Sequence, residues 1–271
     1  MTEHALAPEV AEYYELGGEV TRLTESAGGR LEFLRTQDIL RRLIGPQPAA
    51  VLDVGGATGV HARWLVEDGH AVVLVDPVAS QVEAAARIDG VAAGVGDARD
   101  LSGFGEASFD VVLLLGPLYH LQTEAERRKA LAEARRVARP GGLVVAAAIG
   151  RFAPWLDSLC RGSLAKAYNG PLLGEALATG QLRPREHGFD GFTTAYVHRP
   201  EQLAAEFAQA GLPEADVYAV EGPGWMIASL GEQLDDAVLG PKVLESLRGV
   251  EREPSLLGVS AHLLAASRAP R

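Results

Sequence analysis

The sequence predicts an α/β protein built around a doubly wound, mostly parallel sheet. Short apolar runs of strand length alternate with amphipathic segments from residue 50 to residue 149. These runs are apolar throughout, as expected for strands that are covered on both faces. The first run, AVLDV, is followed by three glycines within five positions. That strand-to-helix turn is where open α/β sheets bind their ligands.

Residues 1–44 are predicted to form a helical N-terminal cover, and residues 45–271 the α/β domain. Leu31, Leu34, Ile39 and Leu43 recur at a helical period before GPQP breaks the pattern. Seven strands are expected, at 50–54, 71–76, 91–95, 109–115, 143–149, 216–222 and 262–268.

The clearest predicted helix follows residue 122. The residues expected to face inward are Ala130, Leu131, Ala134, Val137 and Ala138, and those expected to face solvent are Glu124, Arg127, Arg128, Glu133 and Arg135. Pro140-Gly141-Gly142 is expected to stop it. Another helix is expected over 199–212. Segments 151–198 and 222–258 lack strand spacing and are interpreted as helical insertions.

Composition limits the possible partners. The chain has 271 residues, 47% of them hydrophobic, which is enough for a sizeable core. Its formal net charge of −11 is the wrong sign for a nucleic-acid-binding protein. The single cysteine, Cys160, forms no intrachain disulfide, and no apolar run reaches the ~20 residues that a membrane span needs. We therefore expect a cytoplasmic protein with no membrane or nucleic-acid partner.

The glycine turn does not have dinucleotide spacing. A pyrophosphate fingerprint places glycines at i, i+2 and i+5, which no choice among Gly55, Gly56 and Gly59 satisfies. Instead an acid, Asp53, stands two residues before the first glycine. Acids also end the next two strands, with Asp76 seventeen residues after Gly59 and Asp97 after the third strand.

This order of motifs resembles the class I S-adenosylmethionine-dependent methyltransferases, whose first motif typically reads acid-x-Gly-x-Gly-x-Gly. The resemblance covers about residues 45–150 and implies a Rossmann-like, seven-stranded sheet with helical insertions that form a lid. Ala57 stands where the middle glycine is common, so we expect its φ to stay negative.

The resemblance implies S-adenosylmethionine as the cofactor and assigns its contacts. Gly55, Gly56 and Gly59 would cradle the amino-acid tail. Asp53 is also assigned to the cofactor site; alternatively it caps the turn, or orients the loop through water or main chain. Asp76 would accept hydrogen bonds from the ribose hydroxyls and Asp97 from the adenine amine. Further cofactor contacts are expected from Pro77, Val78, Ala98 and Leu115.

Tyr119 and His120 follow the fourth strand, where the transferred methyl group should emerge. His120 is either a general base for the acceptor or a residue that only shapes the pocket. Tyr13 and Tyr14 are either core residues or a cover for the methionine end of the cofactor, where the candidate partners of its carboxylate are Arg22, Arg30 and Arg35. Possible roof residues are His187, Tyr196, His198 and Trp225, although each is individually more typical of a structural role.

The function predicted from the sequence is methyl transfer to oxygen, nitrogen or carbon of a small molecule, such as a natural-product intermediate. No metal is implied, and a homodimer is compatible with the sequence. Two alternatives stay open, a catalytically silent binding module of the same fold and an NAD-linked oxidoreductase.

Overall fold

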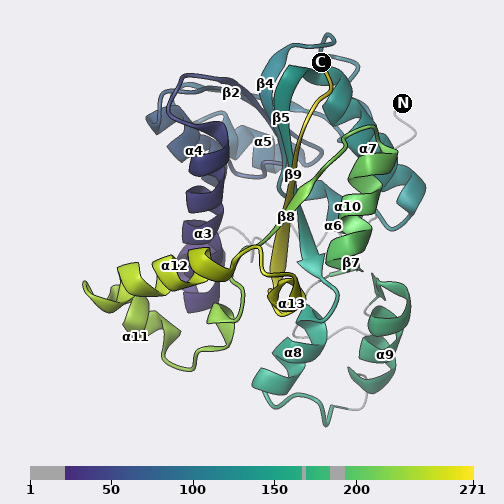
Figure 1. The fold of residues 1–271 in the computed structure, drawn as a ribbon. Helices are drawn as coiled ribbons and strands as arrows, with labels where there is room; N and C mark the ends of the chain where they lie inside the picture. The colour runs from purple at the N-terminus through teal and green to yellow at the C-terminus, as the bar shows by residue number, and fades with distance from the viewer. Residues whose placement is uncertain (1–21, 167–168, 184–192) are drawn as a thin grey trace.

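One mixed sheet forms the centre of the molecule (Figure 1). The computed structural model describes residues 22–166, 169–183 and 193–271. Five parallel strands run in the order β3-β2-β1-β4-β5, β9 pairs antiparallel with β5, and β8 pairs antiparallel with β9. Their bounds are β1 Ala50–Val54, β2 Ala71–Asp76, β3 Val91–Val95, β4 Phe109–Leu114, β5 Ala138–Gly150, β8 Asp216–Ala219 and β9 His262–Arg268. The α/β class with a parallel-dominated, Rossmann-like sheet is confirmed.

The predicted number of seven strands is wrong, because the described residues form nine. All seven predicted strands are present, and the additional two, β6 Gln181–Leu182 and β7 Ala195–His198, come from the first insertion. β5 is long enough that its last two residues, Ile149 and Gly150, also pair with β7. The extra strands therefore extend the sheet at the carboxyl end of β5.

Helices cover both faces of the sheet. Side chains from α7 (Glu124–Val137) and α10 (Pro200–Gln209) join one buried cluster with strands β1, β4 and β5. Side chains from α3 (Ala27–Ile44) and α4 (Val60–Glu67) join the cluster on the opposite face. The short helices α2 (Arg22–Glu25) and α5 (Ala79–Ala85) lie near the carboxyl ends of the strands.

Helix α7 begins with a capping box between Thr123 and Glu126. It ends at Val137, before the predicted Pro-Gly-Gly stop, because Ala138 already has extended dihedrals and pairs with Phe109. The prediction that Arg127 faces solvent is also wrong. Its side chain is buried and pairs with Glu206 of α10, which locks the two helices together.

Both insertions contain helices. The first carries α8 (Ala153–Cys160) and α9 (Asn169–Thr179); the second carries a 3-10 turn (Gly224–Met226), α11 (Leu230–Asp235), α12 (Leu239–Val250) and α13 (Pro254–Leu257). In the described part of the chain, no helix is long and apolar enough to cross a bilayer.

Candidate active site

A cavity opens beyond the carboxyl ends of β1 to β4, where an α/β sheet is expected to bind its ligand. All the residues that line it lie between positions 22 and 121, so the described residues of the two insertions do not line it. The predicted site residues on its wall are Arg22, Asp53, Gly55, Gly56, Asp76, Pro77, Val78, Asp97, Ala98, Leu115, Tyr119 and His120. Tyr13 and Tyr14 lie outside the described residues.

The glycine turn brings main chain directly against the cavity. Gly55 has a φ of +70°, and a Cβ at this position would lie 2.7 Å from Pro117 Cγ. A Cβ at Gly56 would lie 2.6 Å from an Asp53 carboxylate oxygen. Gly59 is different: it does not line the cavity but takes a φ of +82° to start α4, packed against Ile88. Its part is to turn the chain into the helix.

The expectation of a negative φ at Ala57 is wrong, because its φ is +47°. The Ala57 N–H donates to Asp76 Oδ2 at 3.0 Å, and this bond holds the residue in the left-handed region. A side chain with a Cβ pays roughly 1–2 kcal/mol for that conformation. The turn therefore carries strain at Ala57, where the motif described above has its middle glycine.

Asp76 is held by backbone on both sides of its carboxylate. Oδ2 accepts from Ala57 and Oδ1 accepts from the Val78 N–H at 2.9 Å. Burial raises the pKa of Asp76, while these two backbone donors lower it, and burial dominates. Each oxygen retains acceptor capacity beside the cavity, which suits a vicinal diol.

Asp53 is a buried carboxyl group without a partner. Its side chain is 1% exposed, and neither carboxylate oxygen has a hydrogen-bond partner among the described residues. Burial, together with the charge of Asp76, raises the pKa of Asp53 to about 7. In the structure Asp53 does not cap the turn, and it presents an unsatisfied acceptor to the cavity.

Asp97 is engaged by Arg99, a residue that the sequence interpretation missed. Arg99 donates to both Asp97 oxygens, at 2.9 Å from Nε and 2.7 Å from Nη2, and to Glu126 at 2.7 Å. Arg99 also lines the cavity. The only sequence feature that could have indicated this ion pair is the two-residue spacing of Asp97 and Arg99. A ligand at this end meets an acid that is oriented and neutralised by arginine.

Tyr119 and His120 stand on α6 (Pro117–His120), a single turn after β4. The Tyr119 hydroxyl donates to the Leu115 carbonyl at 3.3 Å, and its ring contacts that of His120 at 4.7 Å between centroids. Burial lowers the pKa of His120 to about 4, although a backbone hydrogen bond with Thr194 acts in the other direction. His120 is therefore a neutral imidazole at physiological pH and a weak base.

Of the three candidate arginines, Arg22 lines the cavity. Arg30 pairs with Asp235 at 2.5 Å instead. Arg35 is fully buried against Glu251 and the α3 side chain of Asp38. Two residues that were not predicted, Glu32 and His61, also line the cavity together with Arg22.

The expected roof residues are placed elsewhere. Tyr196 stacks under the Arg127 guanidinium at 3.6 Å, and His198 bonds Glu206 at 3.3 Å. Trp225 donates to the Val259 carbonyl at 3.0 Å. None of the three lines the cavity. His187 lies outside the described residues.

The strand order, the glycine turn and the acids at three successive strand ends together form a cavity at the carboxyl edge of the sheet. Residues 52–146 match the family model described as a methyltransferase domain. This range includes the glycine turn and the three acids Asp53, Asp76 and Asp97. Among curated proteins, none matches the sequence significantly.

Solved structures share the fold across nearly the whole chain. A Thermotoga maritima S-adenosylmethionine-dependent methyltransferase, described as a possible histamine N-methyltransferase, is 18% identical (TM-score 0.57; 96% of this chain and 98% of that chain covered). The Burkholderia thailandensis 1,6-didemethyltoxoflavin-N1-methyltransferase, solved with 1,6-didemethyltoxoflavin and S-adenosylhomocysteine, is 19% identical (TM-score 0.54; 100% and 94% covered). The cyclase SpnF is 18% identical (TM-score 0.56; 100% and 99% covered). At these identities the likenesses show a shared fold.

Proposed function

We propose that the chain binds S-adenosylmethionine in the cavity at the strand ends and transfers its methyl group to a small-molecule acceptor. The observation that carries this proposal is the convergence of Asp53, Asp76 and Asp97 on one cavity, around the exposed backbone of the glycine turn. In this arrangement Asp97 and Ala98 hold the adenine and Asp76 holds the ribose.

The amino-acid tail lies along the turn, beside Asp53. A buried carboxylate without a partner is costly, and a cationic ligand relieves that cost. The same carboxylates disfavour the NAD-linked alternative, because a dinucleotide would bring its anionic pyrophosphate against Asp53 and Asp76. A silent relative has no need to retain the Asp53 carboxyl in a site where it destabilises the fold.

Bound S-adenosylmethionine supplies a methyl group on a cationic sulfur, and transfer is an in-line displacement. The residues of this chain then have to align the acceptor and exclude water. Tyr119 and His120 form the cavity wall after β4, where the acceptor lies. Neutral His120 accepts a hydrogen bond from an acceptor hydroxyl or amine, but its low pKa makes alignment the larger contribution.

A small-molecule acceptor fits the acidic charge of the chain, which disfavours nucleic acid. The Burkholderia neighbour binds a small molecule in the same fold. An intermediate of natural-product synthesis is the acceptor class we favour.

Calorimetric titration with S-adenosylhomocysteine tests the proposal. The wild type should bind it and not NADH, and Asp76→Ala should weaken binding at least about 100-fold, because two hydrogen bonds to a charged acceptor are lost. Asp157→Ala, which alters an exposed ion pair on α8, is the matched control and should bind normally. Absence of S-adenosylhomocysteine binding to the wild type would defeat the proposal.

A second assay follows the conversion of S-adenosylmethionine to S-adenosylhomocysteine in the presence of a small-molecule acceptor. This conversion distinguishes methyl transfer from a different reaction on this fold, such as that of the cyclase neighbour.

A further inference from the structure

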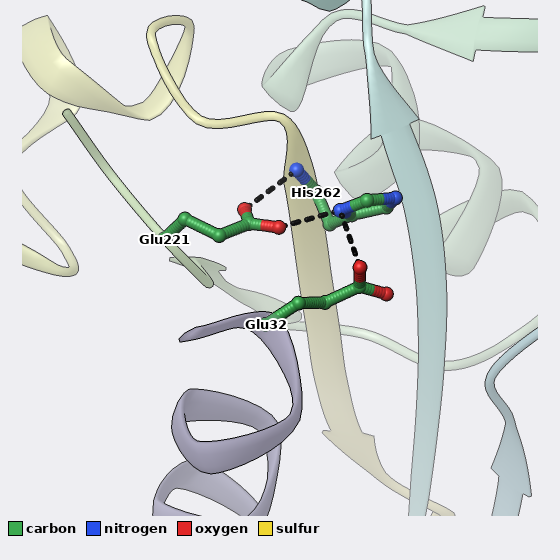
Figure 2. A group of neighbouring side chains, drawn as sticks. All are labelled: Glu32, Glu221 and His262. Carbon is green, nitrogen blue, oxygen red and sulfur yellow. Dashed lines mark hydrogen bonds and ion pairs between the residues drawn. The ribbon is translucent and has the colours of Figure 1, made fainter. Parts of the chain in front are cut away.

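Three ionisable side chains from distant parts of the sequence meet at the cavity wall, where one of them, Glu32, lines the cavity. Glu32 comes from α3, Glu221 follows β8, and His262 begins β9 (Figure 2). His262 Nδ1 lies 2.5 Å from Glu221 Oε1 and 3.6 Å from Glu32 Oε2. The backbone N–H of His262 also donates to Glu221, at 2.9 Å. His262 thus bridges the two carboxylates.

The bridge continues to the cavity wall through Glu32. Both Glu32 oxygens accept from the Arg22 guanidinium, and Arg22 and Glu32 both line the cavity. His61, on the first turn of α4, interacts electrostatically with Glu32 and also lines the cavity. Because α4 follows directly from the glycine turn, this wall faces the end of the cavity assigned to the amino-acid tail.

The charges of the cluster balance without any added ion. Burial by itself would lower the pKa of His262, but Glu32 and Glu221 raise it to about 8. Burial would raise the pKa of Glu32, but His262 and Arg22 bring it below the usual range. Two carboxylates therefore face two cations, Arg22 and protonated His262. The donor atoms lie within 4.8 Å of one another, and a divalent cation would have to displace the His262 proton in order to bind them.

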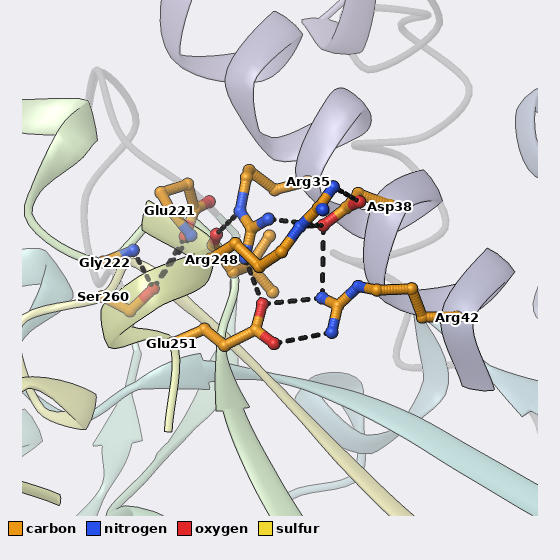
Figure 3. Close-up of polar contacts among 9 residues, drawn as sticks. Arg35, Asp38, Arg42, Glu221, Gly222, Arg248, Glu251 and Ser260 are labelled. Atoms are coloured by element: carbon orange, nitrogen blue, oxygen red, sulfur yellow. Dashed lines mark hydrogen bonds and ion pairs between the residues drawn. The ribbon is translucent and has the colours of Figure 1, made fainter. Parts of the chain in front are cut away.

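A second network of hydrogen bonds holds Glu221 and the backbone next to it in place (Figure 3). Buried Arg35 donates to the Val220 carbonyl at 3.1 Å and to Glu251 at 2.5 Å, which ties α3 to the residue before Glu221. Ser260 donates to Glu221 at 3.0 Å. Glu221 is therefore a fixed anchor, and the position of Glu32 depends on the His262 bridge to it.

Building on the proposed function, we propose that His262 is a positioning residue for the amino-acid end of the cofactor. By bridging Glu221 to Glu32, it fixes the Glu32 carboxylate and through it the Arg22 guanidinium at the cavity wall. The oriented Arg22–Glu32 pair then presents a cation and an anion to a ligand that carries both a carboxylate and an ammonium group. His262 itself does not touch the cofactor.

The test compares two ligands that share the adenosine part. S-adenosylhomocysteine carries the amino-acid tail, and 5′-methylthioadenosine lacks it. His262→Ala should weaken S-adenosylhomocysteine binding about tenfold or more, the equivalent of one hydrogen bond to a charged group, and leave methylthioadenosine binding unchanged. His262→Asn, whose amide keeps a donor close to the Nδ1 position, should recover part of the loss. Arg248→Gln, an exposed change in the neighbouring network, should alter neither affinity.

Equal loss for both ligands in His262→Ala would mean a merely structural role and overturn the proposal. If His262→Ala does not fold, Glu221→Gln, which keeps the side-chain shape, gives the same ratio of affinities. Failure of the wild type to bind either ligand would instead refute the proposed function. A rise in the melting temperature of the wild type with MnCl2 or ZnCl2 that His262→Asn abolishes would assign the cluster to a metal and also overturn the proposal.

Discussion

Replacement of Asp53 by asparagine should stabilise the ligand-free protein at alkaline pH while it weakens cofactor binding. The folded state raises the pKa of Asp53 from an ordinary 3.8 to about 7. The folded protein therefore holds this proton more tightly than the unfolded chain. Stability is greatest at low pH and falls as pH rises from about 4 to about 7.

The magnitude follows from the shift of about three pKa units, at 1.36 kcal/mol per unit, or about 4 kcal/mol in total. By pH 5 the Asp53 carboxyl of the unfolded chain has already ionised, so about 1.5 kcal/mol of the roughly 4 kcal/mol is lost below pH 5. About 2.5 kcal/mol remains to be lost between pH 5 and pH 8. Asparagine cannot ionise, but its buried amide lacks partners, at a cost of about 1–3 kcal/mol that is independent of pH.

Denaturant unfolding of the ligand-free proteins at several pH values between 5 and 8 measures this difference. Relative to the wild type, Asp53→Asn should gain about 2.5 kcal/mol over that range, and its affinity for S-adenosylhomocysteine should fall. Asp110→Asn is the control of opposite sign. There the Ala50 N–H and Arg139 lower the pKa of the carboxyl, so the variant loses stability. A pH-independent difference between Asp53→Asn and the wild type would refute the reasoning.

Three further predictions concern stability. Ala57→Gly should raise the free energy of unfolding by about 1 kcal/mol, because glycine adopts a φ of +47° without strain. The melting temperature should then rise by about 2–4 °C, and an unchanged or lower melting temperature would contradict the strain at Ala57. Arg127→Met should cost about 3 kcal/mol or more in denaturant unfolding, because it leaves the buried Glu206 carboxylate with His198 but without its arginine. Arg127→Met combined with Glu206→Leu should recover most of the loss, and an equally unstable double variant would argue against this. The pKa of His262 is about 8 in the folded state against an ordinary 6.5, so protonated His262 contributes about 2 kcal/mol of stability below pH 6.5 that is lost as pH rises through 8. The free energy of unfolding of the wild type should therefore fall toward that of His262→Asn between pH 6.5 and 9, and parallel pH profiles of the two proteins would be inconsistent with this.

The sheet was predictable because its strands are short, continuous apolar runs, and burial on both faces leaves that pattern in the sequence. Strands β6 and β7 could not be predicted, because Gln181–Leu182 and Ala195–His198 are too short to show an alternating pattern of apolar residues. Arg127 follows the charged pattern of a helix surface, and its burial depends on Glu206, 79 residues later. Such long-range pairs leave no local signal.

The candidate site divides in the same way. Asp53, Asp76 and Asp97 could be predicted to meet, because carboxyl ends of parallel strands share one edge of the sheet. The positive φ of Ala57 depends on the hydrogen bond to Asp76 and is not visible in composition. Glu32 and His262 are separated by most of the chain, so only the folded structure places them together.

A crystal structure of the protein with S-adenosylhomocysteine tests the central claim most directly. The ribose hydroxyls should lie within hydrogen-bond distance of Asp76, the adenine beside Asp97 and Ala98, and the homocysteine along Gly55 and Gly56. A ligand bound elsewhere, or one with its adenine at the glycine turn, would contradict the account.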